Sequence, residues 1–308
     1  MQEIFQNTIN KSVIFEGIGL HSGKNSRVKL IPSEDNQGII FKRTDLKTNN
    51  IIKADYKNVS TAMLCTTLQN SSGCKISTVE HLLAALYILG IDNLVVEVNN
   101  EEIPIMDGSS KDFIKILNTI GIKKLNAKRK YLKILKKIEL EDSDRTISIE
   151  PSNLNFEVKF QLNYENNIIG KQKNTIDFTN DNLEDVYSSR TFCLFKDIEK
   201  IKKNGLAKGG SLSNAVVVKD EEILNDEGLR NKKEFVNHKI LDLAGDFMLS
   251  GYRILGSVKC VQGGHLLSNR FIRKIFEDSS NYELSSLNNI EIIKNNFKNP
   301  INKLAVNA

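Results

Sequence analysis

The order of predicted secondary-structure elements occurs twice along this 308-residue chain, and this repetition strongly restricts its fold. In each half, a series of short strands precedes a helix, a further strand and a second helix. Runs of strands followed by helices are typical of an α+β fold. The sequence therefore predicts two similar α+β domains, each with a mostly antiparallel sheet and two helices on one face.

The first predicted domain covers residues 1–125. Ser77 and Thr78 are expected to cap its first helix, and Gly90 and Gly121 to end its two helices. Its predicted strands are 10–16, 26–31, 39–42, 62–68 and 93–98, and its predicted helices are 78–89 and 109–120.

The second predicted domain covers residues 126–278 and follows a lysine-rich segment, 123–130, that is expected to be a linker. An insertion at about 188–220 contains three glycines and is expected to be a mobile element that faces substrate. Residues 279–308 are expected to form a peripheral tail. The predicted strands are 131–140, 146–150, 156–162 and 254–261, and the predicted helices are 232–249 and 265–278.

Composition indicates a globular protein, with 40% hydrophobic and 26% charged residues. The sequence has no run near the ~20 apolar residues of a membrane span and no N-terminal secretory pattern. We therefore expect a cytoplasmic monomer without stable membrane insertion. The net charge of +5, with lysines and acids interspersed, is weak evidence for nucleic acid, and no nucleic-acid partner is expected. It would suit an anionic small substrate or transient contact with a negatively charged membrane surface.

The four cysteines are scattered and form no C-x-x-C pair. This spacing argues against a zinc site made of thiolates and against a disulfide framework. We expect reduced, mostly buried thiols at Cys65, Cys74, Cys193 and Cys260.

One face of the predicted helix 232–249 combines a nitrogen donor with two carboxylates. His238, Asp242 and Asp246 stand at successive i+4 positions, within an arc of about 80°. A single His-x-x-x-Asp pair is common on exposed helices. The second carboxylate, on a largely apolar helix, favours a metal site.

Glu80 and His81 stand together at the start of the apolar helix 78–89. Burying a carboxylate and an imidazole there is costly unless both have partners. A metal ion would be one such partner, and water or substrate the other. The alternative is that both lie on the exposed edge of the first turn, where an acid favours the helix dipole.

Together, His81, His238 and Asp242 would give a metal ion three protein ligands and an open fourth position, as in catalytic zinc sites. The other two histidines have simpler alternatives. His265 follows a glycine pair and could be an ordinary residue at a helix start. His21 lies in a glycine-rich turn that lacks the dinucleotide-binding pattern, and it could merely cap that turn.

Seven segments together resemble the UDP-3-O-acyl-N-acetylglucosamine deacetylase family, the zinc enzymes of lipid A biosynthesis. They cover nearly the whole chain, from Gly17 to about Asn269, in the family's order. The resemblance implies two α+β domains that face one another, with the site between them and zinc as cofactor. The segments are GIGLHSG (17–23), STVEHLLAAL (77–86), EIPIMDGSS (102–110), SRTF (189–192), GLAKGGSLSNAVV (205–217), HKILDLAGD (238–246) and GGH (263–265).

The resemblance implies hydrolysis of the N-acetyl group of UDP-3-O-(3-hydroxyacyl)-N-acetylglucosamine, which releases acetate. His81, His238 and Asp242 match the zinc ligands. Glu80 matches the general base, and His265 matches the general acid that protonates the leaving amine. The rate is therefore expected to depend on pH in a bell shape, with Glu80 ionised and His265 protonated.

Further matches concern orientation and the UDP-sugar lipid substrate. Asp246 matches the carboxylate that orients the general acid, and Thr191 matches the oxyanion contact. Lys239 and Phe192 match residues that contact the sugar-nucleotide. The insertion resembles the passage for the acyl chain, with matching positions at Leu20, Cys65, Ala207, Ser211, Leu212 and Val217.

Two positions depart from the family pattern. Gln262 stands where the family usually has a basic residue, so one contact to the diphosphate of the substrate is expected to differ. Ser213 stands where the family commonly has an acid. Two alternatives remain at this stage: a zinc amidohydrolase for another acylated sugar, and a non-catalytic zinc-binding or basic binding protein on the same scaffold. Glu80 and His265 argue against the second, because binding alone requires neither.

Overall fold

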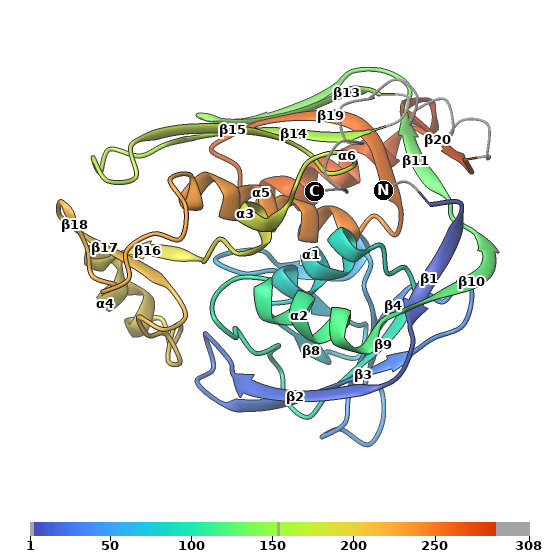
Figure 1. Ribbon diagram of the computed structural model, residues 1–308, viewed down its shortest axis with the longest axis horizontal. Helices are drawn as coiled ribbons and strands as arrows, with labels where there is room; N and C mark the ends of the chain where they lie inside the picture. Colours follow the sequence, from blue (N-terminus) through green and yellow to red (C-terminus); the bar gives the residue numbers. More distant parts are fainter. Residues whose placement is uncertain (1–2, 153–154, 288–308) are drawn as a thin grey trace, which may run out of the picture.

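Two sheets with helices between them form the frame of the computed structural model, which describes residues 3–152 and 155–287. Figure 1 shows a seven-stranded sheet at the top and a five-stranded sheet at the bottom. The predicted α+β class with mostly antiparallel sheets is confirmed. The helices between the sheets are α1 (Glu80–Leu89), α2 (Lys111–Ile120), α5 (Glu234–Met248) and α6 (His265–Glu277).

The five-stranded sheet belongs to the first half. Its side chains alternate, as in β3, where Ser26, Val28 and Leu30 are buried and their neighbours are exposed. This alternation turns one face toward the helices and the other toward solvent. In spatial order the strands are β2 (Val13–Ile18), β3 (Asn25–Pro32), β9 (Leu94–Val98), β4 (Ile39–Arg43) and β5 (Ile51–Lys53), and only β4 and β9 are parallel.

The seven-stranded sheet is built around β19 (Arg253–Val261), which pairs with three other strands. Its β20 (Tyr282–Ser285) follows a short 3₁₀ turn (Ser279–Asn281), so the predicted tail begins with a strand of the sheet. Residues 288–308 of that tail lie outside the described residues. The remaining strands are β11 (Tyr131–Ile134), β12 (Ile138–Asp142), β13 (Arg145–Pro151), β14 (Phe156–Asn163) and β15 (Lys171–Asp177).

Two strand predictions are wrong in detail. Residues 62–66 form a loop between β6 (Val59–Thr61) and β7 (Thr67–Gln69), which form a sheet with β8 (Lys75–Ile76). A 3₁₀ turn (Tyr56–Asn58) precedes this sheet. The predicted strand 131–140 is two strands, β11 and β12.

The predicted linker at 123–130 is also wrong, because β10 (Ile122–Lys128) pairs antiparallel with β1 (Phe5–Ile9). Its lysine side chains face solvent while Leu125 is buried. Lysines are frequent on exposed strands because they discourage pairing with other chains. A lysine-rich composition therefore did not distinguish a solvent-facing strand from a linker.

The predicted insertion forms a small subdomain that projects to the left in Figure 1. It contains a second three-stranded sheet and a lysine-rich helix with no buried residue. Its elements, after the short α3 (Glu184–Tyr187), are β16 (Phe192–Leu194), α4 (Phe195–Lys203), β17 (Val216–Lys219) and β18 (Glu222–Ile223).

The two halves share one core, because buried apolar side chains from both form a continuous cluster. At its centre α1 and α5 cross closely. A Cβ atom added at Gly245 would collide with the carbonyl oxygen of Glu80, so the approach requires glycine. Gly90 ends α1 as predicted, in a left-handed conformation (φ 72°). The predicted cap is wrong: the Thr78 hydroxyl donates to Glu102 instead (2.9 Å).

We predict that Gly245→Ala destabilises the protein, although alanine favours a helix interior by about 1 kcal/mol over glycine. The added methyl must separate α1 from α5, and such overpacking costs about 1–3 kcal/mol. Guanidinium unfolding of the purified variant measures the change. A stability equal to or above that of the wild type would contradict the close contact.

Candidate metal centre and active site

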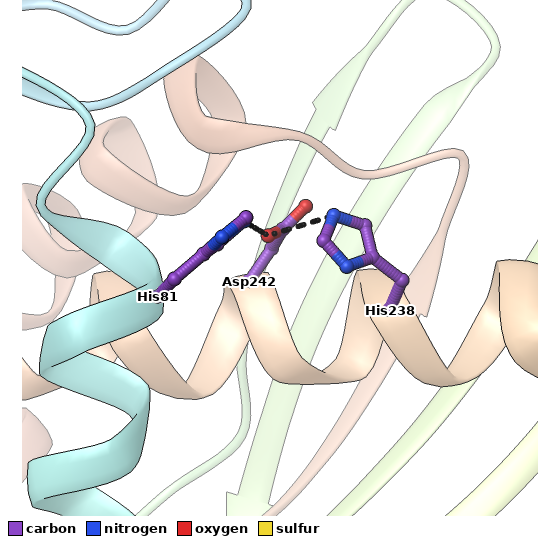
Figure 2. Close-up of side chains that lie close together, drawn as sticks. All are labelled: His81, His238 and Asp242. Atoms are coloured by element: carbon purple, nitrogen blue, oxygen red, sulfur yellow. Dashed lines mark ion pairs between the residues drawn. The ribbon is translucent and has the colours of Figure 1, made fainter. Parts of the chain in front are cut away.

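Three buried side chains from two helices meet where α1 and α5 cross, as Figure 2 shows. The Nε2 atoms of His81 and His238 lie 3.5 and 3.3 Å from Oδ1 of Asp242. All three residues are at most 4% exposed. Their donor atoms lie within 4.8 Å of one another, so one ion could contact all three.

This donor set fits zinc. Ligand atoms at ~2.0–2.2 Å from a tetrahedral zinc ion lie about 3.3–3.6 Å apart, and the two separations above fall in that range. Lys239 Nζ donates to Oδ2 of Asp242 (2.7 Å), whereas Oδ1 has no hydrogen-bond partner among the described residues. A buried carboxylate oxygen without a partner is costly, and a cation at this point would remove the cost.

The ring of His238 is held in the orientation that a metal ligand needs. Its Nδ1 lies 3.1 Å from the carbonyl oxygen of Ser189. A carbonyl can only accept, so Nδ1 carries the proton and the lone pair is on Nε2, which faces Asp242. Burial lowers the pKa of His238 to about 3, which keeps the ring neutral.

A second group of buried side chains adjoins the metal triad. Glu80 begins α1 and His265 begins α6, with Oε1 and Nε2 3.8 Å apart. The other ring nitrogen of His265, Nδ1, lies 3.0 Å from Oδ2 of Asp246. Thr66 joins the two carboxylates, because its backbone N–H donates to Glu80 (3.0 Å) and its hydroxyl to Asp246 (2.7 Å).

The surroundings raise the pKa values of both members of this pair. Burial raises the pKa of Glu80. For His265, burial alone would lower the pKa, but the facing carboxylates of Asp246 and Glu80 outweigh it and raise the pKa to about 10. A buried imidazolium between carboxylates is suited to donate a proton at neutral pH.

Phe192 and Lys239 lie beside the metal triad, whereas the position of Thr191 is fixed only through its backbone. The Phe192 ring lies 6.2 Å from the His238 ring and 5.8 Å from Lys239 Nζ. Thr191 N donates to Gly108 O (2.8 Å). Within the described part of the chain, the Thr191 hydroxyl makes no hydrogen bond to the triad.

The residues predicted for the acyl passage are brought together only in part. The insertion lies on the glycine-rich turn, where Gly209 N donates to Leu20 O (3.0 Å) and Ala207 N to His21 Nδ1 (3.4 Å). Cys65 is buried beside Thr67 and makes no hydrogen bond to this turn in the described residues. Farther along the insertion, Ser211 bonds Ser213, Leu212 is 44% exposed and Val217 is buried in β17.

Sequence reasoning did not identify Thr66 or Glu102. Nothing in the local sequence marks Thr66, which becomes important only because the fold places it between two distant acids. Glu102 is fully buried and accepts from the backbone of His21 (2.8 Å) and Ser22 (2.7 Å) as well as from Thr78. Its position inside the EIPIMDGSS segment was the only available signal.

Comparison with known proteins decides the family. The model of the family "UDP-3-O-acyl N-acetylglycosamine deacetylase" matches residues 6–277. Curated proteins named UDP-3-O-acyl-N-acetylglucosamine deacetylase from Pseudoalteromonas atlantica and Pasteurella multocida are each 40% identical to the chain. The alignments cover 97% and 96% of this chain and 99% and 98% of those proteins. The chain belongs to this deacetylase family.

The deacetylase family is zinc-dependent, in agreement with the donor set described above. Gln262, where a departure from the family pattern is expected, has a defined position in the structure. Its side chain accepts from Asn163 N and donates to Asn163 O, both at 2.7 Å, so it is committed to the backbone of β14. No helix in the described residues is both long and apolar enough to cross a bilayer.

Arg190 of the deacetylase's SRTF segment anchors the loop that orients His238. It is 1% exposed, and its Nε and backbone N donate to Oε1 of Glu234 at 2.8 and 3.0 Å. Glu234 is fully buried in the first turn of α5, one turn before His238. The neighbouring Ser189 thereby places its carbonyl against the imidazole. Glu227 also pairs with Arg190, but its side chain is 58% exposed.

We predict that Glu234→Ala destabilises the deacetylase by about 3–5 kcal/mol, because it leaves the Arg190 guanidinium buried without its main partner. Zinc affinity should fall about 10–100-fold with it, as for other changes to groups that orient a metal ligand. Thermal unfolding and chelator competition measure the two effects. Glu227→Ala is the matched control and should change both far less, since its carboxylate is solvent-exposed; equal losses would refute the role of the buried pair.

Proposed function

We propose that the protein is a zinc-dependent deacetylase that hydrolyses the N-acetyl group of UDP-3-O-(3-hydroxyacyl)-N-acetylglucosamine in lipid A biosynthesis. One observation carries this assignment beyond family membership: a three-donor metal site adjoins a buried carboxylate–imidazole pair. Metal binding alone requires no such pair, whereas amide hydrolysis requires both a base and an acid.

His81, His238 and Asp242 are proposed to hold the zinc ion and leave one position open. Zinc bound there would polarise the amide carbonyl and lower the pKa of a water molecule to ~7. The Ser189 carbonyl keeps the His238 lone pair directed inward, and Lys239 holds the second oxygen of Asp242.

Glu80 is proposed as the general base. Its Oε2 is fixed by the backbone N–H of Thr66, which leaves Oε1 directed toward His265. The carboxylate is 2% exposed, so little bulk water competes for its proton. From this position it can take a proton from the attacking water molecule.

His265 is proposed as the general acid. An amine leaves an amide poorly unless it is protonated, and the Nε2–H of a cationic His265 can supply that proton. Asp246 holds the opposite ring nitrogen, and the Thr66 hydroxyl fixes Asp246 in turn. This chain of contacts sets the ring orientation before substrate binds.

Thr191, Lys239 and Phe192 are proposed to contact the substrate. Thr191 would donate its hydroxyl to the oxyanion, while the other two would contact the sugar-nucleotide. Lys239 lines a cavity of about 180 Å³ with Gln262 and the exposed cation Arg145. The acyl passage is proposed at Leu20, Cys65, Ala207, Ser211, Leu212 and Val217, and apolar Leu212 is exposed there, as an acyl contact requires.

We further propose that the enzyme is a cytoplasmic monomer and that it contacts a negatively charged membrane surface transiently. The net charge of +5 supports an attraction to anionic lipid. Size-exclusion chromatography with light scattering tests the oligomeric state.

Metal removal is predicted to abolish acetate release from the UDP-linked 3-O-acylated substrate. Chelator-treated protein should be inactive, and one equivalent of zinc should restore the rate, because the buried donors offer one three-ligand site. Acetate is measured by a coupled assay. Unchanged release after complete metal removal, or none from the zinc-loaded protein, would overturn the assignment.

We predict that Glu80→Ala and Asp246→Asn lower kcat while the zinc content stays at one per chain. Loss of the base should cost about 10²–10⁴-fold, and loss of the orienting carboxylate less. As a control, the rate and the zinc content are measured on the same sample of each variant. The zinc content should not change, because neither side chain belongs to the donor set. Loss of zinc from the Glu80 variant would make that residue a ligand instead.

A further inference from the structure

A cavity of about 510 Å³ lies where the two halves meet, on the side of the molecule that carries β1 and β10 (right in Figure 1). Its walls include Ile39 and Asn93 from the first half and Met248 and Tyr282 from the second. No residue proposed for metal binding or proton transfer lines it. Met248 is the last residue of α5, so this helix extends from the metal centre to the cavity.

The cavity has an excess of positive charge. Asp92, one of its two acids, is already neutralised, because Arg129 donates to its carboxylate from Nε (3.0 Å) and Nη2 (2.7 Å). The other, Asp55, caps a 3₁₀ turn by accepting from the backbone of Lys57 (2.9 Å). The charged lining residues are Lys53, Asp55, Lys57, Asp92, Arg129, Lys130 and Arg253.

Arg253 is a cation that lines the cavity, and no carboxylate pairs with it alone. Its Nη atoms donate to the carbonyls of Leu86 and Tyr87, and its guanidinium lies 4.1 Å from the Tyr87 ring centre. Its Nε–H has no hydrogen-bond partner among the described residues, and the nearest acid, Asp92, is 3.9 Å away and shared with Arg129. The side chain is only 11% exposed and its Nε atom is fully buried, so Arg253 contributes positive charge to the cavity wall.

The mouth of the cavity combines free ammonium groups with aromatic rings. Lys53, Lys57 and Lys130 are exposed and form no ion pair with any described residue. Tyr56 stacks on Phe276 with ring centres 4.9 Å apart and planes at 5°, and Tyr252 and Tyr282 also line the cavity. Ammonium and guanidinium groups bind phosphate oxygens, and flat rings stack on planar heterocycles.

We propose that this cavity binds a phosphorylated small molecule of about nucleotide size, distinct from the substrate of the metal centre. The exposed lysines hold the phosphate, the positive charge of Arg253 attracts it, and the tyrosines contact the organic part. The volume lies within the range of small-molecule sites, about 300–1,000 Å³. Because both halves contribute to the walls, the bound ligand ties them together and raises thermal stability. The proposal does not rest on the deacetylase reaction.

The test is calorimetric titration of the zinc-loaded full chain with AMP, with adenosine and inorganic phosphate as separate probes. AMP should bind more tightly than either part. The double variant Lys53→Ala/Lys130→Ala should weaken AMP binding at least tenfold and keep the wild-type unfolding temperature in the absence of AMP, which reports folding. Lys47→Ala/Lys171→Ala removes the same charge from exposed positions outside the cavity lining and should leave AMP affinity unchanged.

The variant Lys239→Ala distinguishes AMP binding at the catalytic site from AMP binding in the cavity, because it removes a proposed nucleotide contact at the catalytic site. AMP affinity unchanged by Lys239→Ala but reduced by the Lys53/Lys130 pair supports the cavity. No AMP binding to the wild type, binding lost in Lys239→Ala, or equal weakening by both lysine pairs would overturn the proposal. None of these outcomes depends on acetate release, so failure here is distinct from failure of the deacetylase assignment.

Discussion

The close crossing of α1 and α5 is the contact on which the rest of the site depends. Gly245 lets the backbone of α5 approach Glu80, and this approach brings His81 to within reach of Asp242. The second i+4 step then places Asp246 against His265. A separation of the helices would dismantle the metal triad and the proton-transfer pair together, because both are divided between elements that meet only here.

Burying so many ionisable groups at one crossing is costly, and the fold compensates for each of them with a specific partner. Thr66 serves two carboxylates, Lys239 serves the outer oxygen of Asp242, and Ser189 serves His238. Among the described residues of this site, Oδ1 of Asp242 and Nδ1 of His81 are the exceptions. A polar network that leaves a buried carboxylate oxygen without a partner at the point where a cation fits is one whose stability is linked to metal binding. The apolar core that the two halves share must supply the stability that this network does not.

A feature of the fold or site could be predicted from the sequence when the residues that form it lie close together along the chain. Each of the four core helices is encoded by the periodicity of its own residues, and the His238–Asp242–Asp246 spacing lies within a single helix. The sequence alone therefore predicted these features. The strand β10 was missed because its partner, β1, is more than 110 residues away and its lysines resemble a linker. Thr66 and Glu234 were missed for the same reason, since each acquires its partner only through tertiary contacts. The alternative in which Glu80 and His81 lie on an exposed edge could be decided only by their burial.

A division of tasks between helices and other segments separates the proposed chemistry of this site from the proposed recognition of substrate. The metal donors, Glu80 and His265 all lie on helices, where packing fixes each side chain to within the tolerance that catalysis requires. Most substrate contacts are proposed for a second group of positions, outside these helices, although Lys239 lies on α5. Gln262 and Ser213 both belong to this second group. A substitution there can alter nucleotide or acyl recognition without moving a metal ligand, so specificity can change while the chemistry of the α1–α5 crossing is retained.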